Sequence, residues 1–155
     1  MYTKINEKDS IMKLGAIYSK EKTTFTLFSP VADSVFVIFY DKGNDSAETG
    51  RLEMLRGEGE LRSIFSATAE GNLDGVYYTY EVHTSDGTFS SHDPYARACG
   101  VNGHRSMVID LSKTDPDGFA DEDRPKLADP MSMVITEVSI VDVSAGASAH
   151  SMYPG

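Results

Sequence analysis

Histidine and cysteine are few in this sequence, and its possible metal ligands are badly spaced for a site. The four histidines show none of the short paired spacings that place two ligands on one helix face: His83, His92, His104 and His150. Residues 115–118 read Asp-Pro-Asp-Gly, which resembles the start of a calcium loop, but the later acidic ligands and the closing glutamate are out of register. We therefore expect no metal site and no cofactor.

Catalytic patterns are missing as well. The sequence contains no GxSxG segment, Walker loop or dinucleotide fingerprint, and the lone Cys99 is expected to be a small packed residue. Hydrolysis of a glycosidic bond needs two carboxyl groups about 5–9 Å apart, one of them with a raised pKa. Asp and Glu number 24, but no spacing marks such a pair. We expect no catalytic residues and no enzyme activity from this chain alone.

Length and charge exclude several classes of protein. The 155 residues fit one domain, with room for a fragment of a second, and are too few for a (β/α)8 barrel of about 250 residues. A net charge of −10 opposes binding to nucleic acid and to anionic lipid. Residues 1–19 lack the apolar core of a signal peptide, and no apolar run approaches the ~20 residues of a membrane span. The expectation is a cytoplasmic protein without nucleic-acid or membrane partners.

Short β-type runs separated by turn residues predict an all-β sandwich. They lie at residues 24–28, 34–40, 63–68, 76–84 and 106–111. Both faces of the 34–40 run are apolar, which indicates a central strand or a face that is covered or binds a ligand. Alternation along 76–84 sends Val76, Tyr78, Tyr80 and Val82 to one face and Tyr77, Thr79, Glu81 and His83 to the other. The Asp86-Gly87 pair is expected to form a two-residue hairpin turn.

The C-terminal part of the chain differs in composition. Residues 113–130 are rich in Asp, Pro and Lys and are expected to form an extended linker. Residues 133–143 are mostly apolar and are expected to form one orphan strand. Such a strand is expected to add to the sandwich edge, to pair with a second copy and so cause self-association, or to lower solubility.

Several segments resemble the N-terminal region of type I pullulanases and related debranching enzymes. The resemblance begins at Leu14-Gly15-Ala16 and runs through residues 23–32 and 71–82. It is strongest at Asp93-Pro94-Tyr95-Ala96-Arg97-Ala98 and at residues 100–111, with their Gly-Val-Asn-Gly and Arg-Ser-Met-Val segments. Together these segments cover the chain to about residue 127.

This resemblance implies an immunoglobulin-like β-sandwich of the glycogen-recognition type, placed ahead of an α-amylase-type barrel. The implied domains are the sandwich at 1–112, the linker at 113–130 and a fragment similar to the first barrel strand at 131–155. Four positions fit that strand, Ile135, Glu137, Asp142 and Ser144, whereas other positions depart from the family pattern. The catalytic residues of the family lie on later barrel strands, so the missing barrel is an expected partner, and bacterial cytoplasm the expected location.

Candidate sugar contacts follow from the same resemblance. α-Glucan modules stack sugars on exposed aromatic rings, usually Trp, which this sequence lacks. Phe89 is the best platform candidate, although the alternative, in which it folds back over the sandwich edge, is slightly favoured. Asn102 matches a position that contacts sugar hydroxyls, or is a left-handed turn residue between glycines. Thr79 stands where glycogen binders keep Lys, and Tyr77 flanks the site or packs on the sheet.

Two function classes remain open at this point. In one, the chain is a non-catalytic module that binds starch, glycogen or pullulan for a debranching enzyme. In the other, it is a structural domain that packs on a catalytic barrel and binds no sugar. The absent Trp and the Thr at position 79 favour the second, whereas Phe89 and Asn102 favour the first. Phe28 and Phe65, which stand where the family often has Trp, are expected to lie in the core.

Overall fold

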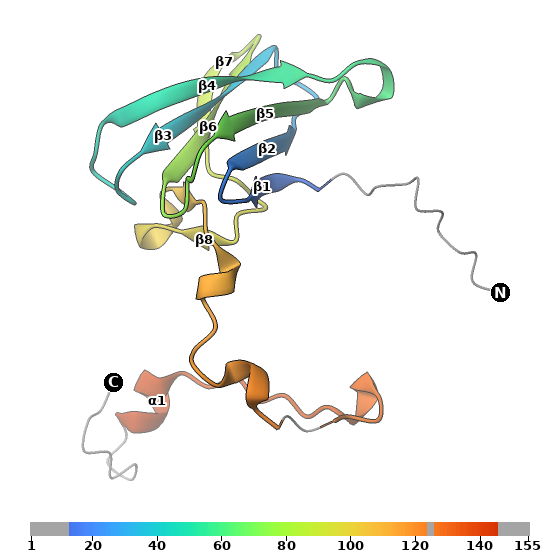
Figure 1. Cartoon of the computed structure of the whole chain (residues 1–155), viewed down its shortest axis with the longest axis vertical. Coiled ribbons are helices and arrows are strands. Elements are labelled where there is room, and N and C mark those ends of the chain that lie inside the picture. Colours follow the sequence, from blue (N-terminus) through green and yellow to red (C-terminus); the bar gives the residue numbers. More distant parts are fainter. Residues whose placement is uncertain (1–12, 124–125, 146–155) are drawn as a thin grey trace, which may run out of the picture. The chain divides into compact units, whose positions relative to one another are not determined.

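The computed structural model describes residues 13–123 and 126–145 (Figure 1). Two compact units follow one another along the chain, at Met1–Asp115 and Pro116–Gly155. The first unit ends close to residue 112, where the sequence places the end of the sandwich. It contains every strand of the described residues.

The first unit is a β-sandwich, which confirms the predicted fold class. Its antiparallel strands run in the order β1-β2-β5-β4-β3-β6-β9-β8, with β7 paired to β6 (Figure 1). The long strand β4 pairs with β3 over most of its length and with β5 through its last two residues, so it belongs to both sheets. The strands are β1 Gly15–Tyr18, β2 Lys22–Phe28, β3 Ser34–Tyr40, β4 Glu48–Arg56, β5 Ile64–Glu70, β6 Tyr77–Thr84, β7 Gly87–Ser91, β8 Ala98–Cys99 and β9 Ser106–Met107.

The core lies between the two sheets and is built from alternate residues of each strand. Phe25, Val35, Val37 and Tyr78 are fully buried, and Phe65 is 1% exposed. The rings of Phe25 and Tyr78 meet edge to face with their centroids 5.0 Å apart, a favoured aromatic geometry. The prediction that Phe65 belongs to the core is confirmed.

The prediction that Phe28 lies in the core is wrong. Its side chain is 55% exposed, because its register partner is Ile64 and this pair lies on the outer face of the sheet. Phe25 and Leu27 take the inward positions on the same strand.

A buried carboxylate connects strand β6 to the loop that follows β7. Asp93 is 4% exposed, and its Oδ2 accepts hydrogen bonds from the hydroxyls of Tyr78 at 2.7 Å and Tyr80 at 3.1 Å. Its Oδ1 accepts from the backbone N–H of Tyr95, and its own N–H donates to the Ser106 hydroxyl, both at 2.8 Å. The Asp-Pro-Tyr segment therefore supplies a polar anchor inside an otherwise apolar core.

The hairpin between β6 and β7 forms as expected, but its turn is displaced by one residue. Thr84 pairs with Gly87, which leaves Ser85 and Asp86 as the two turn residues in place of the predicted Asp86-Gly87 pair. The Thr84 hydroxyl stabilises this turn, since it accepts from the Asp86 N–H at 3.2 Å. Gly87 has a φ of 136°, which β-carbon-bearing residues rarely adopt.

The described residues also contain five short helical turns. The 3₁₀ turns are η1 Gly59–Leu61, η2 Val101–Gly103, η3 Leu111–Lys113, η4 Phe119–Asp121 and η5 Pro130–Ser132. The region predicted to be an extended linker therefore contains η4 and overlaps η3 and η5 at its two ends.

The predicted strand at residues 133–143 does not form. Residues 133–139 have no regular structure, and the short helix α1 covers Ile140–Ser144. The Ser139 hydroxyl accepts from the Asp142 N–H at 3.4 Å and so caps this helix. An apolar run becomes a strand only when a neighbouring strand completes its hydrogen bonds, and the described residues provide none for it.

Candidate functional site

The outer face of strand β6 carries the polar residues that the alternation predicts. Tyr78 and Tyr80 are fully buried against the core, whereas Tyr77, Glu81 and His83 are partly exposed on the opposite face. This face continues over the central strand β3 onto β4, and over β7 on its other side. The predicted central position of residues 34–40 is confirmed.

A polar pocket of about 350 Å³ lies on this outer face. Its walls come from β6, the ends of β3 and β7, the loop at residues 41–46 and the turn that precedes β9. The lining residues are Tyr40, Asn44, Asp45, Thr79, Ser90, His104 and Arg105. Hydroxyl, amide, carboxylate, imidazole and guanidinium groups are all present, so the pocket offers both donors and acceptors.

Thr79 is the predicted site residue that the structure places in this pocket. Its side chain is 5% exposed, and its hydroxyl lies 3.3 Å from the hydroxyl of Tyr40. Tyr77 lies outside the lining and packs under the 41–46 loop. Its Cε1 would be only 3.2 Å from a β-carbon built on Gly43, so the Tyr77 ring packs directly against the loop.

Arg105 connects the 41–46 loop to the rest of the pocket wall. Its guanidinium lies over the Tyr40 ring, 3.5 Å from the ring centroid. The same group donates to the backbone carbonyl of Lys42 at 2.7 Å and to the carbonyl of Ser46 at 2.9 Å. The loop is thereby held by contacts from a residue far along the chain.

Phe89 is exposed, as a platform would require, but it lies on the other side of the sheet from Thr79. Its side chain is 54% exposed. Phe89 pairs directly with Val82, and residues opposite each other in antiparallel strands share a face. Val82 packs against the core, so Phe89 projects along the inner face at the sheet edge, while its neighbour Ser90 lines the pocket. The structure does not bring Phe89 and Thr79 into one pocket.

Asn102 adopts the turn conformation that the flanking glycines indicated. Its φ of 53° and ψ of 23° are left-handed, and it lies inside η2 with its side chain exposed. It is not among the pocket-lining residues, although His104 and Arg105 directly after this turn are.

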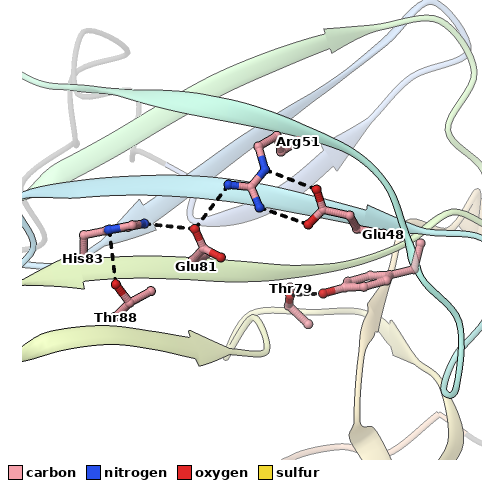
Figure 2. A network of polar contacts seen from close by, with 7 residues as sticks. Glu48, Arg51, Thr79, Glu81, His83 and Thr88 are labelled. Atoms are coloured by element: carbon pink, nitrogen blue, oxygen red, sulfur yellow. Dashed lines mark hydrogen bonds and ion pairs between the residues drawn. The ribbon is translucent and has the colours of Figure 1, made fainter.

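A polar network occupies the same outer face beside the pocket. Figure 2 shows Arg51 between Glu48 and Glu81, with His83 and Thr88 continuing the chain of contacts. The Arg51 guanidinium donates to Glu48 at 3.0 Å, and this hydrogen bond lowers the pKa of the Glu48 carboxyl. These side chains satisfy one another and keep the face hydrophilic.

The neighbouring carboxylates Asp74 and Asp110 lack the properties of a catalytic pair. Asp74 and Asp110 lie at one end of the sandwich, where Lys113 contacts both. The hydrogen bond from Lys113 lowers the pKa of Asp74, and the Ser112 hydroxyl lowers the pKa of Asp110. A general acid for glycoside hydrolysis needs a raised pKa, so both carboxylates are ionised at neutral pH and donate no proton.

Metal-binding clusters and membrane-spanning helices are absent from the part of the chain that the structure describes. No cluster of three or more His, Cys, Asp or Glu side chains has the geometry to hold a metal ion there. None of the helices in that part has the length and apolar character needed to cross a bilayer.

Comparison with known proteins decides the family. The family model described as carbohydrate-binding module 48, the isoamylase N-terminal domain, matches residues 13–96, which include β1 to β7 and the Asp93 anchor. This chain belongs to the carbohydrate-binding module 48 family. It is therefore a non-catalytic accessory module of the pullulanase type, as the resemblance of its sequence segments implied.

Similar sequences are pullulanases of much greater length. Pullulanase A of Streptococcus pneumoniae serotype 4 is 31% identical over 116 residues, which are 70% of this chain and 9% of the relative. The pullulanase of Bacillus subtilis strain 168 is 28% identical over 97 residues, which are 63% of this chain and 13% of the relative. The chain thus spans about a tenth of the length of these relatives.

Solved pullulanase structures share the fold of this module. The pullulanase of Bacillus acidopullulyticus is 35% identical with a TM-score of 0.75, over 87% of this chain and 16% of that one. The pullulanase of Paenibacillus barengoltzii, in complex with maltohexaose and α-cyclodextrin, is 33% identical with a TM-score of 0.76. That match covers 87% of this chain and 20% of the other.

Sequence reasoning found Thr79 but missed the other six residues that line the pocket: Tyr40, Asn44, Asp45, Ser90, His104 and Arg105. The apolar outer face of residues 34–40 signalled a covered or ligand-binding surface, and Tyr40 ends that run. Arg105 belongs to the Arg-Ser-Met-Val segment of the resemblance, but no local pattern assigned it a partner.

Proposed function

We propose that this module binds α-glucan through the pocket around Thr79 and so holds an attached debranching enzyme on branched glucan. The observation that carries the proposal is the pocket itself, in which a threonine, a tyrosine, a serine and an arginine from separate segments face one hollow. Sugar hydroxyls donate and accept hydrogen bonds, and this mixed lining serves both roles.

Charge also supports a neutral ligand. The chain carries a net charge of −10, which disfavours phosphorylated or nucleic-acid ligands but leaves a neutral polysaccharide unaffected. The Arg105 guanidinium already donates to two backbone carbonyls, so the pocket contains no uncommitted cation cluster for an anion. The maltohexaose and α-cyclodextrin in the complex of the Paenibacillus barengoltzii pullulanase are linear and cyclic glucans, the class of ligand proposed for this module.

The experiment is affinity electrophoresis of the whole chain in gels containing glycogen, with Thr79→Val beside the wild type. This substitution removes the hydroxyl at nearly constant shape, and loss of one hydrogen bond is expected to weaken binding by up to about tenfold. Thr68→Val on the outer face of the other sheet is the matched control, because Thr68 bonds only Thr24 there. Equal retardation of all three proteins places the sugar elsewhere, and no retardation of the wild type rejects glucan binding.

A second function, packing against a catalytic barrel, is supported by apolar side chains exposed on the sandwich. Phe28, Val31 and Leu55 are 55%, 73% and 74% exposed. Phe28 and Leu55 share the outer face of the β2-β5-β4 sheet, since Leu55 pairs with Ser66 and Phe28 with the nearby Ile64. This face lies on the sheet opposite the pocket strands, so the two functions are compatible. Absence of glucan binding at millimolar ligand leaves packing as the function.

Self-association is a further proposal for the second unit. Val134, Ile135 and Val138 are 93%, 79% and 61% exposed and form no strand in this structure. Exposed apolar segments of this kind pair readily with a second copy. Sedimentation velocity across a concentration series tests this, and a monomer at every concentration rejects it.

A further inference from the structure

We propose that Arg105 is the positioning residue that builds the glucan pocket, because it fixes the 41–46 loop and covers one face of Tyr40. The inference rests on the proposed glucan-binding function for its ligand. The claim that Arg105 holds the 41–46 loop in place does not depend on the ligand and rests only on contacts between described residues.

Three hydrogen bonds from one guanidinium hold both ends of the loop. One terminal nitrogen of Arg105 donates to the Lys42 carbonyl at 2.7 Å and to the Ser46 hydroxyl at 2.8 Å. The other terminal nitrogen donates to the Ser46 carbonyl at 2.9 Å. Charge-assisted hydrogen bonds are stronger than neutral ones, and the rigid planar fork fixes the spacing of the two carbonyls. Asn44 and Asp45, which line the pocket, lie between these attachment points.

Stacking on Tyr40 determines which part of that ring a ligand meets. The guanidinium carbon lies 3.5 Å from the ring centroid and therefore occupies one face of the ring. The Tyr40 hydroxyl is meanwhile 3.3 Å from the Thr79 hydroxyl. A sugar that enters the pocket cannot stack on the covered face and meets hydroxyls and the guanidinium edge instead. Arg105 thus selects hydrogen-bonded recognition over the aromatic stacking that a Trp platform would supply.

The close approach of Gly43 and Gly100 is a second, independent observation on the position of this loop. A β-carbon on Gly100 would lie 2.5 Å from the α-carbon of Gly43, closer than any real contact. One on Gly43 would lie 2.8 Å from the α-carbon of Gly100. The loop reaches the Arg105 side of the pocket only because neither residue carries a side chain. Gly100→Ala therefore forces the loop and the backbone at position 100 apart, and it keeps the Arg105 side chain, although the Gly100 N–H also donates to the Arg105 carbonyl at 2.8 Å.

The test compares Arg105→Lys and Gly100→Ala with the wild type in the whole chain. Lys keeps the charge but loses the fork, so it cannot hold both carbonyls and the ring at once. Arg97→Lys is the matched control, since Arg97 is exposed and lines a different pocket beside Leu111. Two quantities are measured: the affinity for maltohexaose by calorimetry and the hydrogen exchange of backbone amides 42–46.

Arg105→Lys is expected to bind maltohexaose at least about tenfold more weakly, the factor that one lost charge-assisted hydrogen bond corresponds to, and Gly100→Ala is expected to bind it more weakly because the loop is displaced. Both are also expected to exchange amides 42–46 faster, whereas Arg97→Lys matches the wild type in both measurements. Unchanged exchange in Arg105→Lys overturns the inference, and so does full affinity in Gly100→Ala despite faster exchange. A wild type that binds no maltohexaose rejects the proposed function, and hydrogen exchange then decides the attachment of the loop by itself.

Discussion

The Tyr78 hydroxyl donates a 2.7 Å hydrogen bond to Asp93, and Tyr80 donates to the same carboxylate oxygen. This relationship connects the core-facing residues of strand β6 to the loop that carries the Asp-Pro-Tyr segment. A buried carboxylate is costly unless it is well bonded, and here two hydroxyls and one backbone N–H satisfy it. The anchor holds the pocket strand β6 from its inner face, while the ligand groups project from the outer one.

Asp93→Asn is expected to destabilise the module by about 1.5–3 kcal/mol, because two tyrosine hydroxyls lose a charged acceptor. Chemical denaturation followed by far-UV circular dichroism measures this change in the free energy of unfolding. Asp86→Asn is the control, since Asp86 lies exposed in the β6–β7 turn. Equal stability of Asp93→Asn and the control would contradict the role of the anchor.

Alkaline pH is expected to destabilise the fold. Burial, followed by the negative charge of Asp93, raises the pKa of both Tyr78 and Tyr80. In the unfolded chain both ionise near pH 10, so the free energy of unfolding is constant below about pH 10 and falls as the pH rises beyond it. Melting temperatures between pH 8 and pH 11.5 measure this fall. The double variant Tyr78→Phe with Tyr80→Phe should show a smaller slope, and an identical slope would point to other groups.

Much of the sandwich follows from local patterns. The period-two alternation at residues 76–84 assigns every inward and outward side chain of β6 correctly, because one face of the strand is core and the other is polar. The same rule explains the error at Phe28, where the inward positions belong to Phe25 and Leu27. Aromatic type alone does not decide burial.

The pocket depends on contacts that no local pattern carries. Arg105 and Lys42 are 63 positions apart, and their hydrogen bond exists only after the turn and the loop have packed together. For Phe89, too, the local sequence does not determine on which face of the sheet the side chain lies. Its side chain is 54% exposed, but the face that it occupies depends on the register with Val82, which the displaced turn at Ser85 and Asp86 sets.

The apolar run at residues 133–143 shows that amino-acid composition alone does not determine whether a strand forms. High β-propensity marks a segment that fits a sheet, but the ladder must come from a partner strand. In this chain the run instead ends in the short helix α1. Similarity of these residues to a first barrel strand stays a prediction.

Phe89→Ala is expected to leave the affinity for maltohexaose within about twofold of the wild type, since surface substitutions away from a site change energies by about ±0.5 kcal/mol. The reason is the position of Phe89 on the face opposite Thr79. Calorimetry with the wild type and Thr79→Val in parallel measures it. An affinity loss as large as that of Thr79→Val would show that the sugar reaches around the edge strand β7.

Acid is expected to weaken the contact between η3 and the turn before β6. The Lys113 ammonium lies 2.6 Å from the Asp74 carboxylate and lowers its pKa, so the contact stabilises the fold above the ordinary Asp pKa and is lost as the pH falls through the lowered value. Protection factors of amides 110–114, corrected for intrinsic exchange and followed from pH 7 down to pH 2, measure this loss. Asp74→Asn should show the lower protection at every pH, and protection in Asp74→Asn at pH 7 equal to that of the wild type would contradict the contact.

The most direct measurement is the map of backbone amide shifts in the ¹⁵N-labelled chain as maltohexaose is added. Glucan binding at the pocket predicts saturable shifts at Tyr40, Thr79, Ser90 and Arg105, with the amides of β1 and β5 unchanged. Saturable shifts centred on Phe89 or on the exposed residues Phe28 and Leu55 would contradict this site. No shifts at millimolar maltohexaose would contradict glucan binding itself.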